Sequence, residues 1–228
     1  MTIFLFALKR SLQKKSMLVA LCLIPFVMIL IRPLWVSENP SGFSFFGMLI
    51  LFAAFSLVRI IMTDRVTGVS IRIFAAPVTN LQYMTQNLLA FSSLLSTQIV
   101  VLITIGAIIH SWETGMALSL IFCYIVFAVA SISFSLAWHG LFRSKVMSDA
   151  VFSIVISFMA LLGGIFIPIS MLPDSLRRIG MLFPVYWLSE SLLFILGQGT
   201  SSDYWLAIFI MLLFSAAFLL YGSKRRLE

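Results

Sequence analysis

The sequence predicts an all-α integral membrane protein with one transmembrane domain over residues 1–228. Of these residues, 61% are hydrophobic and 10% are charged, and the mean hydropathy is +1.12. Soluble domains carry charge on about a quarter of their residues, so this chain has too little polar surface to cover a soluble globule. Six apolar runs, each close to the roughly 20 residues that a membrane-crossing helix needs, indicate the same fold class.

The six predicted transmembrane helices are residues 17–35, 43–62, 81–109, 116–142, 146–169 and 204–222. Basic residues gather near both termini and in every second connection: 9–15, 65–72, 143–145 and 224–226. The other connections carry acidic residues such as Glu38 and Glu113. Because cytoplasmic loops are enriched in Lys and Arg, both termini are predicted to be cytoplasmic in a multi-pass protein of the cell membrane. This charge distribution fits anionic lipid headgroups rather than nucleic acid.

Residues 1–15 are predicted to form an amphipathic helix at the membrane interface. Apolar residues at positions 3–8 precede Lys9, Arg10, Lys14 and Lys15. The apolar part is too short to be the core of a cleaved signal peptide, whereas basic amphipathic segments are typical of interfacial helices. A basic segment leading into an uncleaved first transmembrane helix is the alternative.

The segment 63–80, between the second and third spans, has helical periodicity. Its apolar residues Val66, Val69, Ile73 and Phe74 share one face, and Pro77 ends the pattern. Asp64 stands where a carboxylate favours a helix start. We expect a short amphipathic helix on the cytoplasmic membrane surface. Such a helix could transmit force from a soluble partner, or the segment could be an ordinary ordered loop.

The first half of the third span is unusually polar. Its polar residues are Gln86, Asn87, Ser92, Ser93, Ser96, Thr97 and Gln98. Polar side chains at membrane depth face protein or water, so this half is predicted to face away from lipid. Helix packing and a translocation pathway both account for the pattern. In the fourth span, Ala128, Ser131 and Ser135 share a face and would permit close helix approach.

The outer segment 163–202 is punctuated by glycine and proline: Gly163, Gly164, Pro168, Pro173 and Pro184. Leu176, Ile179 and Phe183 share one face of a short helix that Pro184 is predicted to end. A second apolar piece, 185–196, is too short to span comfortably. Two short helices dipping into the outer leaflet fit this pattern. A surface loop anchored by Tyr186 and Trp187 is the alternative.

Ionisable residues within the spans are few. Arg32 and Arg59 lie near span ends, where long basic side chains reach the interface, so both are predicted to be anchors there. His110 and His139 are likewise predicted to be interfacial residues. No predicted span carries a central Asp or Glu, which argues against a proton- or sodium-coupled carrier.

Sequence motifs for catalysis are missing. There is no G-x-x-x-x-G-K-[ST] phosphate loop, no H-E-x-x-H and no G-x-S-x-G. Cys22 and Cys123 have neither the spacing nor the histidine neighbours of a zinc site. We therefore predict no catalytic or metal-binding residue, and any use of ATP must come from a partner.

These residues together resemble the membrane subunit of ABC-2 type ABC transporters, over nearly the whole chain. The cytoplasmic loop of that family reads like Glu-Arg-Glu-x-Gly-Thr-x-Glu-x-Leu-x-x-Thr-Pro, and the matching positions here are Asp64, Arg65, Gly68, Arg72 and Pro77. Apolar residues replace more polar ones at Val66, Val69, Ile71 and Ala76. The outer stretches 163–168, 171–173 and 183–187 are the more specific match.

The resemblance implies a role for each of these segments. Segment 63–80 would be the coupling helix that docks on the ATPase, with Asp64, Arg65, Gly68, Arg72, Ile73, Phe74 and Pro77 as its coupling residues. Re-entrant helices would close the outer end of the pathway at Gly163, Gly164, Pro168, Pro173, Phe183, Pro184 and Trp187. Candidate pathway residues are Gln86, Asn87, Ser93, Thr97 and Gln98. The N-terminal segment resembles the family's gate helix.

The implied function is that of a permease subunit in an ABC exporter, without catalytic activity of its own. ATP and Mg²⁺ would be bound by a separate ATPase subunit, and a second permease chain would complete a homodimer or heterodimer. The Phe- and Met-rich spans favour an amphipathic or hydrophobic substrate, such as a drug, an antimicrobial peptide or a lipid-like molecule. Export of a polysaccharide or lipid-linked glycan is an alternative. A non-transporting scaffold or sensor that recruits a cytoplasmic partner is another.

Overall fold

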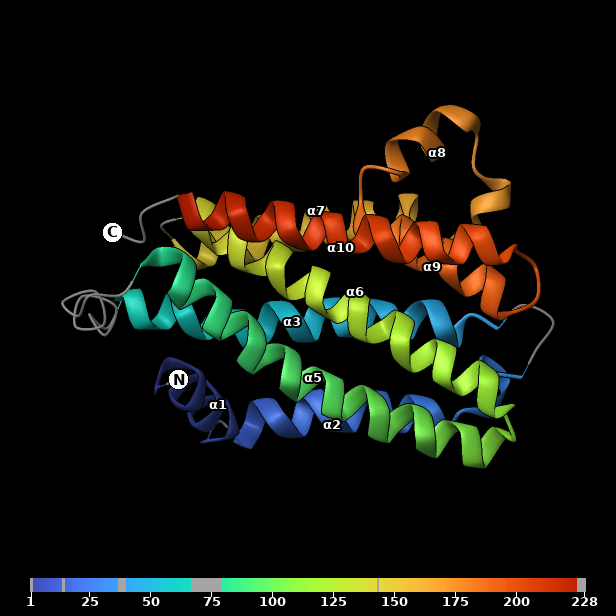
Figure 1. Cartoon of the computed structure of the whole chain (residues 1–228), viewed down its shortest axis with the longest axis horizontal. Coiled ribbons are helices and arrows are strands. Elements are labelled where there is room, and N and C mark those ends of the chain that lie inside the picture. Colours follow the sequence, from blue (N-terminus) through green and yellow to red (C-terminus); the bar gives the residue numbers. More distant parts are fainter. Residues whose placement is uncertain (1, 14, 37–39, 67–78, 143, 225–228) are drawn as a thin grey trace.

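Helix α6 (Thr114–Leu141) lies at the centre of the bundle in the computed structural model, which describes residues 2–13, 15–36, 40–66, 79–142 and 144–224 (Figure 1). It packs against α3 (Gly42–Val66), α5 (Asn80–His110), α9 (Pro184–Ile195) and α10 (Ser201–Lys224). Its small residues Ala128, Ser131 and Ser135 are all buried. Small side chains let helix backbones approach closely within a membrane, so the predicted packing face of the fourth span is confirmed.

The remaining helices surround this centre. They are α1 (Thr2–Gln13), α2 (Lys15–Leu30), α7 (Lys145–Leu162) and α8 (Asp174–Gly180), with short 3₁₀ turns η1 (Arg32–Leu34) and η2 (Ile169–Met171). The described residues contain no strand, so the all-α prediction is confirmed for them. Helices α3, α5 and α6 begin and end within a few residues of the predicted second, third and fourth spans.

Five described helices are long and apolar enough to cross a membrane: α3, α5, α6, α7 and α10. The short pair α8–α9 is bent by 106° and would raise the number to six if it counted as one span. Within the predicted first span, 17–35, the described apolar helical stretch is Leu21–Leu30, which is shorter than the five long helices. The structure therefore supports a multi-pass membrane protein with five to six long apolar helices.

Two predicted spans are longer than the helices found. Helix α2 ends at Leu30 rather than Trp35, because Pro33 lies in a 3₁₀ turn and Trp35 folds back to donate from Nε1 to the Met28 carbonyl oxygen at 2.9 Å. Helix α7 ends at Leu162 rather than Ile169, since Gly163 and Gly164 follow it directly. The predicted spans thus have the correct type but extend too far at these ends.

The connections between the helices lie at the two opposite ends of the bundle. Figure 1 shows α1, the end of α3, the start of α5, the start of α7 and the end of α10 at one end, hereafter the inner end. The opposite, outer end carries η1, the turn between α5 and α6, and the pair α8–α9. This grouping matches the alternation of basic and acidic connections in the sequence, since Lys145 starts α7 and Lys224 ends α10.

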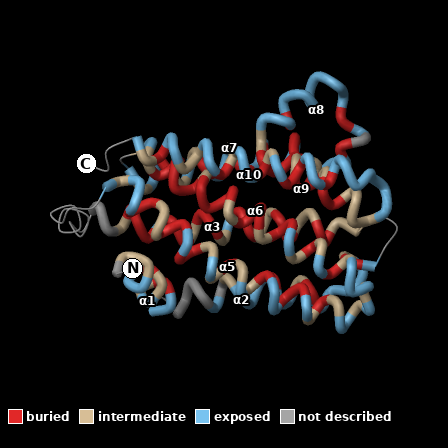
Figure 2. The backbone as a smooth tube through the Cα atoms, viewed as in Figure 1, coloured by how far each residue is buried: buried red, intermediate tan, exposed pale blue. Residues whose placement is uncertain are grey.

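Apolar side chains cover the outside of the bundle as well as its interior. Figure 2 shows buried residues along the inner faces and exposed ones along the outer faces. Large exposed apolar residues include Ile154 and Phe158 on α7 and Trp205 and Phe209 on α10. A water-soluble monomer rarely exposes apolar surface on this scale, so these faces suit contact with lipid.

Candidate functional site

The predicted coupling residues all belong to segment 63–80, which begins in the last turn of α3. Asp64 and Arg65 are in the last turn of α3, and their side chains are outside the described part of the structure. The rest of the set also lies outside the described residues: Gly68, Arg72, Ile73, Phe74 and Pro77. Helix α5 starts immediately after the segment with a capping box, in which Thr79 Oγ1 accepts from Gln82 N and Gln82 Oε1 accepts from Thr79 N, both at 3.2 Å.

Helix α3, which leads into this segment, is joined to α7 at the inner end. Arg59 of α3 forms an ion pair with Asp149 of α7. About one helical turn away, four residues before Arg59 in α3 and three residues after Asp149 in α7, the rings of Phe55 and Phe152 stack. Their centroids are 3.5 Å apart and their planes are 11° apart. The ion pair and the stack together fix α3 and α7 over a full turn. Arg59, predicted as an interface anchor, thus has a specific partner.

His139 of α6 completes this inner cluster. Its ring stacks on Phe55 with centroids 4.7 Å apart, and its Nδ1 lies 3.3 Å from Ser148 Oγ of α7. The residue is 1% exposed, so His139, predicted as an interfacial residue near a span end, is buried between α3, α6 and α7. Its position near a span end gave no signal of this burial, because the covering residues lie on α3 and α7, distant in sequence.

The outer end of α7 meets α9 at a glycine. A Cβ atom at Gly163 would lie 2.5 Å from both Val185 Cγ1 and the Met159 carbonyl oxygen. Ser189 Oγ of α9 donates a hydrogen bond to the Gly163 carbonyl oxygen at 2.5 Å. Gly164 has a φ of +85°, a conformation that side chains rarely adopt. Both glycines are therefore required by the contact between α7 and α9.

The other predicted gate residues stand at the ends of the short outer elements. Pro168 precedes η2, Pro173 precedes α8, and Phe183 precedes α9. Pro184 is the first residue of α9, where its missing N–H costs nothing. Trp187 Nε1 donates to the Met181 carbonyl oxygen at 2.9 Å, which closes the turn between α8 and α9.

The end of α8 differs from the prediction. The helix ends at Gly180, and Phe183 precedes α9 instead of continuing α8. A Cβ atom at Gly180 would lie 2.5 Å from the Leu162 carbonyl oxygen at the end of α7. The sequence predicts one continuous helix through Gly180. The chain turns at this residue instead, because α8 approaches the end of α7 closely there.

A polar triad missing from the predicted site holds α8 against α9. Arg177 Nε donates to Tyr186 Oη at 3.0 Å, and Tyr186 Oη donates to Glu190 Oε1 at 2.6 Å. Arg177 Nη2 lies 3.6 Å from the same carboxylate oxygen. The four-residue spacing of Tyr186 and Glu190 places them on one helical face, which is the available sequence signal. The triad spans the 106° bend between the two helices.

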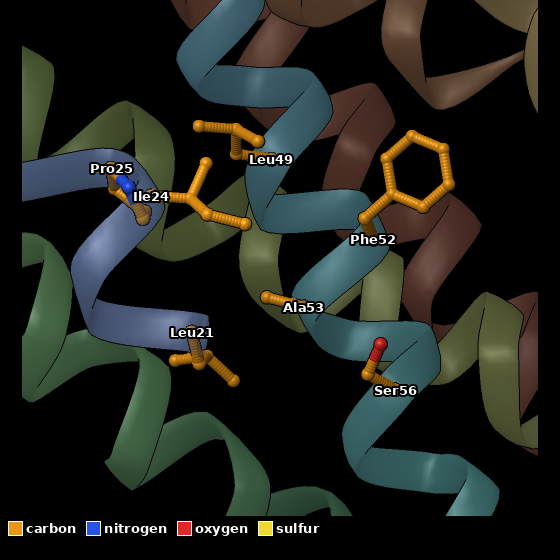
Figure 3. A pocket seen from close by; sticks show the side chains of 7 residues that line it. All are labelled: Leu21, Ile24, Pro25, Leu49, Phe52, Ala53 and Ser56. Carbon is orange, nitrogen blue, oxygen red and sulfur yellow. The ribbon is translucent and has the colours of Figure 1, made fainter. Parts of the chain in front are cut away.

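Two hollows border these sites. One, of about 300 Å³, lies at the outer end against the gate segment and is lined by residues including Ser44, Gly164, Pro168 and Ser189. The other, of about 150 Å³, separates α2 and α3 and is shown in Figure 3. Ile24 and Pro25 border it from α2, and Leu49, Phe52, Ala53 and Ser56 border it from α3. The hollow between α2 and α3 is lined almost entirely by apolar residues, whereas the outer hollow has a mixed lining that includes Ser41, Ser44, Ser189 and Gln198.

The five candidate pathway residues of α5 divide into two groups. Gln86 Oε1 accepts from Phe4 N of α1 at 3.3 Å, and Gln98 Nε2 donates to the Leu21 carbonyl oxygen of α2 at 2.7 Å. Asn87 is buried and donates to the Tyr83 carbonyl oxygen at 2.8 Å. Ser93 and Thr97 are exposed and donate to carbonyl oxygens of their own helix. Packing of α1 and α2 accounts for the two glutamines.

Comparison with known proteins gives one family match. A family model described as "ABC-2 family transporter protein" matches residues 39–224. The matched region runs from just before α3 to the end of α10, and it includes both the inner cluster and the outer gate segment. No curated protein matches the chain.

Proposed function

Because the chain belongs to the ABC-2 family of transporter proteins, we propose that it is the permease subunit of an ATP-driven exporter in the cell membrane. Separate ATPase subunits bind ATP and Mg²⁺ and dock on segment 63–80 at the cytoplasmic, inner end, where both termini also lie. A second permease chain, identical or related, completes the pathway. The chain itself carries out no hydrolysis.

The observation that carries this proposal is the connection of the inner end to the outer gate segment through two helices. Helix α3 leads out of segment 63–80 and is tied to α7 by Arg59–Asp149 and by the Phe55–Phe152 stack. Helix α7 then reaches the outer end, where Gly163 contacts Val185 and Ser189 of α9. A displacement at the inner end therefore has a packed route to the outer helices.

This arrangement supports a lever mechanism. Nucleotide-driven movement of the ATPases shifts α3, and the ion pair makes α7 move with it. Gly163 and Gly164 act as the hinge between α7 and the outer pair, since hinges are a few residues at element ends that absorb the backbone change. The triad of Arg177, Tyr186 and Glu190 keeps α8 and α9 together, so the pair moves as one gate.

The substrate is proposed to be amphipathic or hydrophobic: a drug, an antimicrobial peptide or a lipid-like molecule. Support comes from the apolar lining of the hollow between α2 and α3. The described ion pair between long helices, Arg59–Asp149, joins the last two turns of α3 to the first two turns of α7. Ser93 and Thr97 are the pathway candidates that are exposed on α5, and their hydrogen bonds go to carbonyl oxygens of α5 itself.

ATP-dependent uptake into inverted membrane vesicles tests this proposal. The chain is expressed with the ATPase that co-purifies with it, and the vesicles receive a fluorescently labelled cationic antimicrobial peptide, a hydrophobic cationic dye or a labelled lipid-linked glycan. We expect ATP-dependent uptake of the peptide or the dye. Uptake of the glycan alone would support the polysaccharide or lipid-linked glycan alternative. A co-purifying partner without ATPase activity would support the scaffold alternative.

A further inference from the structure

A groove runs along the bundle between α2 and α5, with α1 at one end. Its volume is about 720 Å³. One face of each long helix lines it: Val19, Cys22 and Phe26 from α2, and Leu94, Val101 and Ile105 from α5. Leu12 of α1 contributes to the lining at the inner end of the bundle. The Gln98–Leu21 hydrogen bond holds the two long helices together beside the groove.

The size and lining of the groove fit a flexible hydrocarbon chain. Between Leu94 and Ile105 it follows about 16 Å of α5 at roughly 1.5 Å per residue, or about half of a hydrocarbon core near 30 Å thick. Its volume falls within the roughly 300–1,000 Å³ typical of ligand sites. Thr97, Gln98 and Cys22 are the exceptions in an otherwise apolar lining.

The α1 end of the groove is basic. Lys9 is exposed and lies three residues before Leu12, so both side chains are on the same face of α1. The sequence adds Arg10, Lys14 and Lys15 in the same stretch, and its first acidic residue is Glu38. A ligand with its tail in the groove would therefore place its polar end near Lys9. Such clusters beside a membrane surface attract anionic lipid headgroups.

We propose that this groove binds one anionic phospholipid, with an acyl chain between α2 and α5 and the headgroup beside Lys9 of α1. A plain lipid-facing surface would accept any phospholipid, whereas this open apolar groove has the basic residue Lys9 beside one end and would therefore prefer an anionic headgroup. The bound lipid would fill the space between α2 and α5 and stabilise the contact of α1 with the bundle. Helices α1 and α2 lie outside the family match, whereas α5, which brings the pathway candidates Thr97 and Gln98 into the lining, lies within it.

Photocrosslinking in nanodiscs tests the site. The purified chain is placed in phosphatidylcholine discs that contain a small fraction of either phosphatidylglycerol or phosphatidylcholine with a photoactivatable diazirine in the acyl chain. Mass spectrometry then locates the crosslinked peptides. We expect phosphatidylglycerol to label the peptides containing residues 19–26 and 94–105 at least threefold more than phosphatidylcholine does. The double variant Lys9→Gln/Arg10→Gln should reduce this preference to parity.

Adjacent valines on α5 provide a matched pair of variants. Val101 lines the groove and is 51% exposed, whereas Val100 is 40% exposed and does not line it. Val101→Trp should fill the groove and remove most of the labelling, and Val100→Trp should leave it unchanged. Equal labelling by both lipids, or equal effects of the two variants, would overturn the proposal. Crosslinks to a second copy of the chain across the groove would also overturn it, by identifying another occupant.

Discussion

Arg59 of α3 and Asp149 of α7 form an ion pair at the inner end of the bundle, about one helical turn from the stacked rings of Phe55 and Phe152. The two charged residues are 90 positions apart in the sequence. Helix α3 leads into segment 63–80, and α7 leads to the outer segment 163–202. Under the proposed function, the pair would link the docking segment of the ATPase with the outer helices.

Breaking this pair should impair coupling more than stability. Arg59 and Asp149 side chains are 46% and 27% exposed, so we expect Asp149→Asn to cost only about 0.2–1 kcal/mol of stability. Substrate-stimulated ATP hydrolysis should fall several-fold. The swapped pair Arg59→Asp/Asp149→Arg should recover hydrolysis relative to either single swap. Additive losses in the double-mutant cycle would show that the two residues act independently.

Replacing Gly163 should loosen the contact between α7 and α9. The added Cβ atom of Gly163→Ala would meet Val185 and the Met159 carbonyl oxygen at 2.5 Å, so we expect a loss of about 1–3 kcal/mol. Thermal unfolding can be followed with a thiol-reactive dye in a Cys22→Ser background, because Cys123 is fully buried until the protein unfolds.

Gly115→Ala is the control for this variant. Gly115 lies in the first turn of α6, and a Cβ atom added there would have no neighbouring atom within 4 Å, so alanine should be neutral or slightly stabilising. If Gly163→Ala unfolded at the same temperature as Gly115→Ala, the close contact between α7 and α9 would be refuted.

Removing the hydroxyl of Tyr186 should release α8 from α9. Tyr186→Phe deletes the bridge between Arg177 and Glu190, whose charged atoms are 3.6 Å apart, so we expect a loss of about 0.5–1.5 kcal/mol. Amide hydrogen exchange in α8 should become faster. Unchanged exchange there, with faster exchange elsewhere, would contradict the role of the triad.

Single cysteines should report opposite sides of the membrane for the two ends. In a Cys22→Ser background, Lys145→Cys and Lys224→Cys should resist an impermeant maleimide in intact cells, while Thr114→Cys and Gln198→Cys should react. The reason is that Lys145 and Lys224 start and end helices at the inner end, and Thr114 and Gln198 belong to the outer end. Reaction at Lys145→Cys from outside would reverse the proposed topology.

Local sequence patterns were sufficient for the long helices. The predicted third span, 81–109, matches α5 (Asn80–His110), because its apolar residues recur along the whole stretch despite the polar first half and Thr79 caps its start. The breaks in the outer segment were also predictable, since Pro168, Pro173 and Pro184 mark the starts of η2, α8 and α9. Such signals require no knowledge of the tertiary fold.

Long-range contacts explain what sequence reasoning missed. The burial of His139 depends on Phe55 of α3 and Ser148 of α7, and the partner of Arg59 is Asp149 on another helix. Gln86 and Gln98 looked like pathway residues because their polarity was visible, whereas their contacts with α1 and α2 were not. Periodicity in the sequence indicates which face of a helix is polar or apolar. The helix that packs against this face is determined by the tertiary fold.

The most direct test of the account asks whether segment 63–80 recruits an ATPase. The tagged chain is purified in mild detergent from its native membrane as wild type, Phe74→Ala and Arg72→Ala, and phosphate release from ATP is measured in each eluate. Truncating a buried aromatic anchor typically costs about 2 kcal/mol or more, whereas an exposed charge contributes under about 1 kcal/mol. We predict that Phe74→Ala loses most of the co-purifying hydrolysis while inserting normally, and that Arg72→Ala loses little. Wild-type hydrolysis with Phe74→Ala would contradict docking on this segment.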